Sequence, residues 1–191
     1  ERWTLDGASD HRVSEPLYLT DPEGNGVEIY RDRPRERWPR TDDGSVRMAT
    51  LPLDLDDVAA ESGGAMDAPA GTTLGHVHLE ATAIAAAREF YVDALGLDVM
   101  MDAGSALFLA AGGYHHHIGV NTWNGRSEPA GGRGLAWFEV VVPDADAVES
   151  ARQRLSEAGV DVVERDSAAT GHGSAIEFAD PDGIEIRLRA E

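Results

Sequence analysis

Histidines and carboxylates are the side chains of this 191-residue chain that could bind a metal ion, because the sequence contains no cysteine. Five histidines fall in two short segments: His76 and His78 in one, and His115, His116 and His117 in the other. Residues two apart lie on the same face of a strand, so we expect His76 to share a face with His78, and His115 with His117. Two interpretations remain open: these imidazoles line a polar cavity, or they form a metal site.

A second set of reactive side chains, His11, Tyr18 and Glu28, surrounds a turn at residues 21–24. Taken one by one they are unremarkable, since a single Glu on a terminal strand usually faces solvent. His11 and Tyr18 could likewise be ordinary loop and core residues. Their combination in one short run is what indicates a site.

The turn sequence Asp-Pro-x-Gly occurs twice, at residues 21–24 and 180–183. Asp can accept hydrogen bonds from the backbone of its own turn, Pro fixes φ, and Gly accepts positive φ. Each copy therefore predicts a β-hairpin. We expect the paired strands at 16–20 and 26–30, and at 174–178 and 184–188.

The elements around these turns follow a repeated order. Residues 72–123 and 135–190 each predict a strand, a helix and three further strands. The expected helices, 83–95 and 145–158, each end at a glycine, Gly96 and Gly159. The other expected strands are 74–79, 98–101, 106–110, 115–123, 135–142 and 160–164. The fold class is therefore α+β, built from repeated βαβββ units.

The remaining segments complete the expected domain organisation. Residues 1–30 correspond to the end of an earlier unit, whose start we expect upstream of Glu1. Residues 31–70, rich in charge and Pro, predict a linker with a short helix within 53–61. Residues 71–191 form a complete domain of two units.

The amino-acid composition restricts the kinds of partner and the location that we expect. The formal net charge is -19, and all the basic residues are Arg. A phosphate-rich partner would be repelled, so we expect no nucleic acid. No apolar run approaches the roughly 18 residues of a membrane span. With no signal-peptide pattern and no cysteine, we expect a cytoplasmic protein. The charge fits either a well-solvated acidic surface or a halophilic protein from a salt-rich cytoplasm.

The run from Asp10 to Glu28 resembles the signature of type I extradiol ring-cleaving dioxygenases. That signature has a small residue two before a His, a spacer, an apolar residue and Tyr, Asp-Pro-x-Gly, and a final Glu. One departure is Ser9, where Gly or a β-branched residue is usual. Three later segments resemble the vicinal oxygen chelate superfamily (glyoxalase, bleomycin resistance and extradiol dioxygenase), in particular its catechol-2,3-dioxygenase-like members: Gly75 to Leu79, Phe90 to Leu97, and Gly112 to Gly119.

This resemblance implies paired βαβββ units that form cup-shaped, curved mixed sheets. It also implies a metal, most commonly Fe(II), with Mn, Zn or Ni as alternatives, and a substrate with vicinal oxygens, such as a small catechol-like aromatic, together with O2. By resemblance Glu28 is the carboxylate ligand, His11 the acid–base residue and Tyr18 a hydrogen-bonding residue. The His ligands of that site would precede Glu1.

In the second domain the resemblance places His76 at a first-strand ligand position and His115 or His117 near a fourth-strand one. Glu185 could replace the usual carboxylate. Aligning the two turns places Arg187 where the first copy has Glu28.

The same alignment shows that the other matching positions of the last unit also hold different residues. It sets Glu177 against Tyr18 and Thr170 against His11, and Trp137 occupies the first-strand ligand position. The last unit therefore lacks the usual ligand set.

Three functions follow as hypotheses: a metal-dependent extradiol dioxygenase, a glyoxalase-type isomerase or lyase, or a non-enzymatic protein that binds small molecules such as antibiotics. Self-association into a homo-oligomer is expected from the exposed cup edge.

Overall fold

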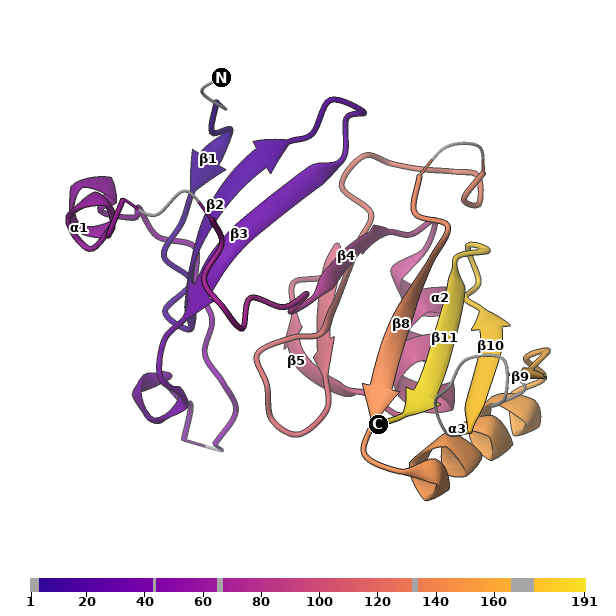
Figure 1. Cartoon of the computed structure of the whole chain (residues 1–191). Coiled ribbons are helices and arrows are strands. Elements are labelled where there is room, and N and C mark those ends of the chain that lie inside the picture. The colour runs from indigo at the N-terminus through magenta and orange to yellow at the C-terminus, as the bar shows by residue number, and fades with distance from the viewer. Residues whose placement is uncertain (1–3, 43, 65–66, 132–133, 166–173) are drawn as a thin grey trace. The chain divides into compact units, whose positions relative to one another are not determined.

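The computed structural model describes residues 4–42, 44–64, 67–131, 134–165 and 174–191. The chain divides into two compact units, Glu1–Gly75 and His76–Glu191 (Figure 1). No helix in these ranges is both long enough and apolar enough to cross a membrane.

The first unit contains a three-stranded antiparallel sheet in the order β1-β2-β3. Its strands are β1 (Gly7–Ala8), β2 (Ser14–Thr20) and β3 (Gly26–Asp32). The turn between β2 and β3 closes through the Gly24 N–H, which donates to the Asp21 carbonyl at 3.0 Å. Gly24 has a φ of 90°, which the absence of a Cβ permits. The predicted hairpin is confirmed.

The segment after β3, for which we predicted a linker, is in part packed against this sheet. It contains the 3-10 helix η1 (Arg35–Arg37) and the helix α1 (Leu55–Ala60). Trp38 and Val46 are buried. An isolated antiparallel bridge joins Asp10 to Leu51. Residues 49–51 therefore lie beside the segment that leads into β2, because the Ala49 N–H also donates to the His11 carbonyl.

The second unit holds two four-stranded sheets with the same topology, in the orders β4-β7-β6-β5 and β8-β11-β10-β9. Each sheet is one βαβββ repeat. Its first strand pairs parallel with its last strand, and the other pairs are antiparallel. The repeated βαβββ order and the α+β class are thus confirmed. The strands are β4 (Val77–Glu80), β5 (Asp98–Asp102), β6 (Ala106–Ala110), β7 (Ile118–Asn121), β8 (Trp137–Val142), β9 (Val163–Arg165), β10 (Ala175–Ala179) and β11 (Glu185–Ala190).

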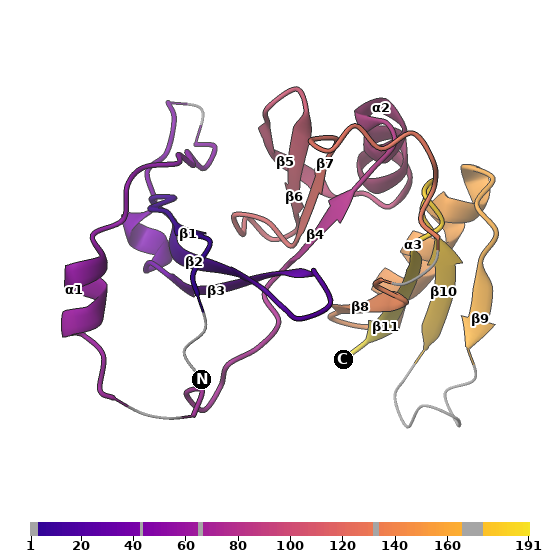
Figure 2. The ribbon, with the colours of Figure 1, turned by 90° about the horizontal axis from the view of Figure 1, so that it is seen from above.

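Helices cover one face of each of these sheets (Figure 2). Helix α3 (Ala145–Glu157) begins at Asp144, whose carboxylate accepts from the Ala147 N–H at 2.8 Å. The other predicted helix, 83–95, is confirmed in position but changes its hydrogen bonding midway: α2 (Ile84–Arg88) continues as the π-helix η2 (Glu89–Ala94).

The two βαβββ units of this domain share one apolar core. Phe90 from η2 meets Phe178 from β10 with ring centroids 6.1 Å apart. The Arg154 guanidinium on α3 donates to the Leu95 carbonyl at 2.8 Å. These contacts explain why residues 76–191 form a single compact unit.

Candidate functional site

The first unit brings His11 to Tyr18 and pairs Tyr18 with Glu28 across the hairpin. His11 lies in the turn before β2, and its Nε2 is 2.6 Å from the Tyr18 hydroxyl. Its Nδ1 is 2.7 Å from the carbonyl oxygen of Ala49. The Tyr18 hydroxyl also makes a hydrogen bond with the Ser9 side chain. The result is a continuous chain from Ser9 through Tyr18 and His11 to Ala49.

The partners fix the direction of this chain. A carbonyl oxygen only accepts, so His11 Nδ1 must carry a hydrogen. In the neutral imidazole Nε2 is then the acceptor, and Tyr18 donates to it. The tautomer of His11 is thereby set by a backbone group. The imidazole presents a basic nitrogen to a phenol.

Tyr18 and Glu28 face each other across the hairpin. They are directly paired residues of antiparallel β2 and β3, so their side chains lie on the same face. Burial, followed by the negative charge of Glu28, raises the pKa of Tyr18 to about 12, against a smaller lowering by Ser9. The phenol is therefore protonated at neutral pH. It is available as a donor.

Two members of the chain were not identified as functional from the sequence. Ser9 was noted only as a departure from the dioxygenase signature, and the structure places its side chain on the Tyr18 hydroxyl. Ala49 lies 38 residues from His11 and contributes only its carbonyl, which no side-chain pattern can reveal. The departure at Ser9 was thus the one available signal.

A metal implied by the resemblance needs several ligands. Among the residues with a described position, no group of three or more His, Asp or Glu side chains is arranged to hold a metal ion. In the first unit Glu28 is the carboxylate predicted as a ligand, and a 2-His-1-carboxylate site also requires two imidazoles. The described residues therefore do not make up a complete metal site. The ligand role of Glu28 stays a prediction.

The predicted histidine cluster of the second unit is arranged differently from our expectation. Residues 115–117 precede β7, which begins at Ile118, so they do not form the predicted strand. His115 is fully buried, whereas His117 is exposed and accepts from the Ala111 N–H at 3.3 Å. The expectation that these two share a strand face is wrong, because the seven-residue loop 111–117 replaces the tight hairpin predicted at Gly112 and Gly113.

The imidazoles of this region are packed among one another and against aromatic rings. His115 and His116 approach Nδ1 to Nδ1 at 2.8 Å, so one of the two nitrogens donates and the other accepts. His76 lies against His116 with ring centroids 4.3 Å apart. The rings of His78 and Trp123 lie with their centroids 5.1 Å apart. The His78 ring also lies over Gly119, where a Cβ would come within 3.0 Å of it. Metal ligation by His76, His115 and His117 stays a prediction.

The second hairpin carries different side chains in the same register. Glu177 of β10 pairs with Arg187 of β11, as Tyr18 pairs with Glu28. Arg187 Nε donates to Glu177 at 3.1 Å, and its guanidinium lies 3.7 Å above the ring of Trp137. The predicted replacement of the usual residues is thus visible as an ion pair with cation–π stacking. Thr170 lies outside the described residues.

Residues 73–188 match the family model of the Glyoxalase/Bleomycin resistance protein/Dioxygenase superfamily. The chain belongs to this superfamily. Over 169 residues it is 41% identical to the protein named Catechol-2,3-dioxygenase from Bacillus subtilis (strain 168). The match covers 85% of this chain and 59% of that relative, so the chain spans less than two thirds of the relative's length.

The fold of this chain is similar to that of a protein of known structure. It is an integron cassette protein from the mobile metagenome of the Halifax Harbour sewage outfall, with a TM-score of 0.51 and 20% sequence identity. The alignment covers 62% of this chain and 98% of that protein. At this identity the match shows the fold alone.

Proposed function

We propose that this chain carries part of the active site of an extradiol dioxygenase, which cleaves the ring of a catechol-like substrate with O2. The observation that carries the proposal is the hydrogen bond from Tyr18 to His11 beside Glu28. The 41% identity to a protein named Catechol-2,3-dioxygenase supports the reaction class. Membership in the superfamily alone would not, because its members differ in chemistry.

The residues of the first unit suit proton transfer to and from a substrate hydroxyl. Because Nδ1 of His11 keeps its hydrogen on the Ala49 carbonyl, Nε2 is the atom that can take up a proton. A hydroxyl approaching Tyr18 can pass its proton to the phenol oxygen as the phenol proton moves to Nε2. Reversal of the same path returns the proton. With a pKa of about 12 for Tyr18, a concerted transfer avoids a free phenolate.

Fe(II) is the metal we propose for this reaction, by analogy with the reaction class of the relative. Such a metal would supply open coordination positions for a chelating substrate and for O2. Glu28 is the described residue we propose as one of its ligands. The remaining partners would be small molecules: the aromatic substrate and O2.

The test combines the intact protein with Fe(II) under anaerobic conditions and then adds catechol and O2. We expect oxygen uptake and a yellow ring-fission product. His11→Gln should lower kcat by about 10²- to 10⁴-fold, the usual contribution of an acid–base residue. No product from a panel of substituted catechols would contradict the proposal. Turnover with Ni(II) or Zn(II) without oxygen uptake would instead indicate a glyoxalase-type isomerase.

A further inference from the structure

Residues 49–51, within the segment that we predicted as a linker, make backbone hydrogen bonds to the turn that carries His11. The Asp10 N–H donates to the Leu51 carbonyl at 2.8 Å, and the Leu51 N–H donates back at 3.0 Å. The Ala49 N–H donates to the His11 carbonyl at 3.3 Å. The backbone on both sides of the His11 imidazole is therefore tied to residues 49–51. The carbonyl that sets the tautomer belongs to the same segment.

Asp10 is the residue through which this arrangement is fixed. Its Oδ1 accepts from the Arg12 N–H at 2.7 Å, and its Oδ2 accepts from Arg33 at 2.9 Å. Arg12 has a φ of 67° and is, among the described residues, the one non-glycine with positive φ. A non-glycine in this conformation is strained, and the Asp10 side chain satisfies its N–H. The strained residue directly follows His11.

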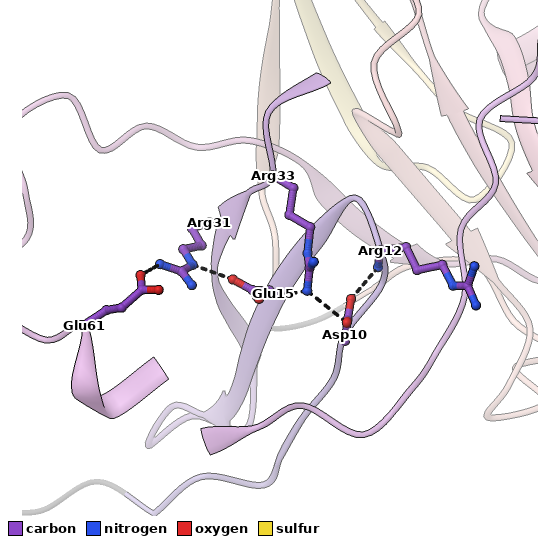
Figure 3. A network of polar contacts seen from close by, with 6 residues as sticks. All are labelled: Asp10, Arg12, Glu15, Arg31, Arg33 and Glu61. Carbon is purple, nitrogen blue, oxygen red and sulfur yellow. Dashed lines mark hydrogen bonds and ion pairs between the residues drawn. The ribbon is translucent and has the colours of Figure 1, made fainter. Parts of the chain in front are cut away.

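Arg33 connects this turn to the rest of the sheet (Figure 3). One of its nitrogens lies 2.9 Å from both Asp10 and Glu15. Glu15 in turn pairs with Arg31, which also contacts Glu61 at the end of α1. Each exposed ion pair of this kind contributes little alone. Asp10 and Glu15 are the less exposed partners, so the inner part of the network is the part that constrains geometry.

We infer that Asp10 is a positioning residue, which together with Arg33 and residues 49–51 holds His11 as the Nδ1–H tautomer with Nε2 directed at Tyr18. The structural half of this inference concerns the imidazole alone. Its effect on turnover rests on the proposed dioxygenase function. A backbone acceptor cannot be protonated or lost by titration, so it holds one tautomer more firmly than a side-chain partner would.

The structural half is tested by ¹⁵N NMR of histidine-labelled protein, which reports the tautomer of each imidazole. His11→Gln identifies the His11 signals. In the unmodified chain we expect His11 to be mainly the Nδ1–H form at pH 8. Asp10→Ala should convert these signals to a mixture of tautomers, and Asp10→Asn, which keeps an acceptor for Arg12, should restore most of the original form. Glu61→Gln, at the far end of the network, is the matched control and should change nothing.

The inference is overturned if Asp10→Ala folds normally by circular dichroism and its His11 signals match those of the unmodified chain. It is also overturned if Asp10→Ala fails to fold and the folded Arg33→Gln variant leaves the tautomer unchanged.

The catalytic half is tested by kinetics. Asp10→Ala should lower kcat about tenfold with KM changed less than twofold. Retention of the full kcat in a variant with mixed tautomers would overturn this half. Absence of ring cleavage in the unmodified intact protein would refute the proposed function, whereas the NMR outcome would still decide the role of Asp10.

Discussion

The two Asp-Pro-x-Gly hairpins have the same backbone and opposite environments. In both, the Gly N–H donates to the Asp carbonyl at 3.0 Å. At the first hairpin Asp21 lies at the surface, and hydrogen bonds from Asn25 lower its pKa. At the second, burial raises the pKa of Asp180, which accepts from Tyr91 at 2.8 Å and from the Ile184 N–H at 2.8 Å.

The difference teaches that one turn motif can serve two purposes. The second hairpin is a structural anchor between the βαβββ units, since the neighbouring Asp182 accepts from the Thr82 N–H at about 3.1 Å. At the first hairpin, the strands β2 and β3 instead carry Tyr18 and Glu28 as paired residues. Side chains that contact the turn, rather than the turn itself, decide which purpose it serves.

The largest effect is expected on stability from Asp180→Ala. This change leaves the Tyr91 hydroxyl and two backbone N–H groups without their buried acceptor, and should lower the free energy of unfolding by about 3 kcal/mol. Asp21→Ala in the exposed hairpin is the matched control and should cost much less. Urea denaturation measures both. Equal costs would remove the distinction between anchor and surface turn.

The next effect is on catalysis. Tyr18→Phe removes the donor to His11 and should lower kcat for ring cleavage about 100-fold. Glu177→Gln changes the residue at the same register of the second hairpin and should leave kcat unchanged. A comparable loss in both variants would show that the second hairpin also takes part in the reaction.

The pH dependence of the two hairpins should have opposite sign. A raised pKa means that folded Asp180 binds more protons than the unfolded chain, so its contribution to stability grows as pH falls toward 3.8. A lowered pKa means the reverse for Asp21, whose contribution is lost as pH falls below 3.8. The cost of Asp180→Asn should therefore rise on acidification, and that of Asp21→Asn should fall. Urea midpoints between pH 3 and 7 test this; parallel trends would contradict it.

The smallest effect is expected from Arg187→Gln. Its ion pair with Glu177 is partly exposed, so its loss should change the free energy of unfolding by less than about 1 kcal/mol. Trp137 fluorescence should change, because the guanidinium leaves its ring. Ring-cleavage activity should be unaffected. A loss of activity would mean that this ion pair belongs to the active site.

Much of the fold follows from local sequence signals. Turn residues and alternation placed both hairpins and their paired strands, and the structure added the register that pairs Tyr18 with Glu28. Glycine stops and apolar periodicity placed α3 within one residue of its observed end. These features depend on residues close together in the chain, where geometry is nearly fixed by residue type.

Predictions failed where distant segments decide the outcome. His115 and His117 separate because residues 111–117 form a loop, and β7 begins later than alternation suggested. The helix at 83–95 becomes a π-helix around Phe90 and Tyr91, both of which pack into the shared core. Neither event has a marker within the segment itself.

The sequence by itself determined the repeat, the hairpins and the residue types that surround them. Only the tertiary structure decided that the Ala49 carbonyl meets His11, that Ser9 meets Tyr18, and that Asp180 is buried. The physical reason is that hydrogen bonding by a backbone carbonyl and desolvation of a carboxylate depend on the groups brought near by folding. The sequence therefore decides which side chains are present near the hairpins, and the tertiary structure decides which of these side chains carry a proton and at which atom.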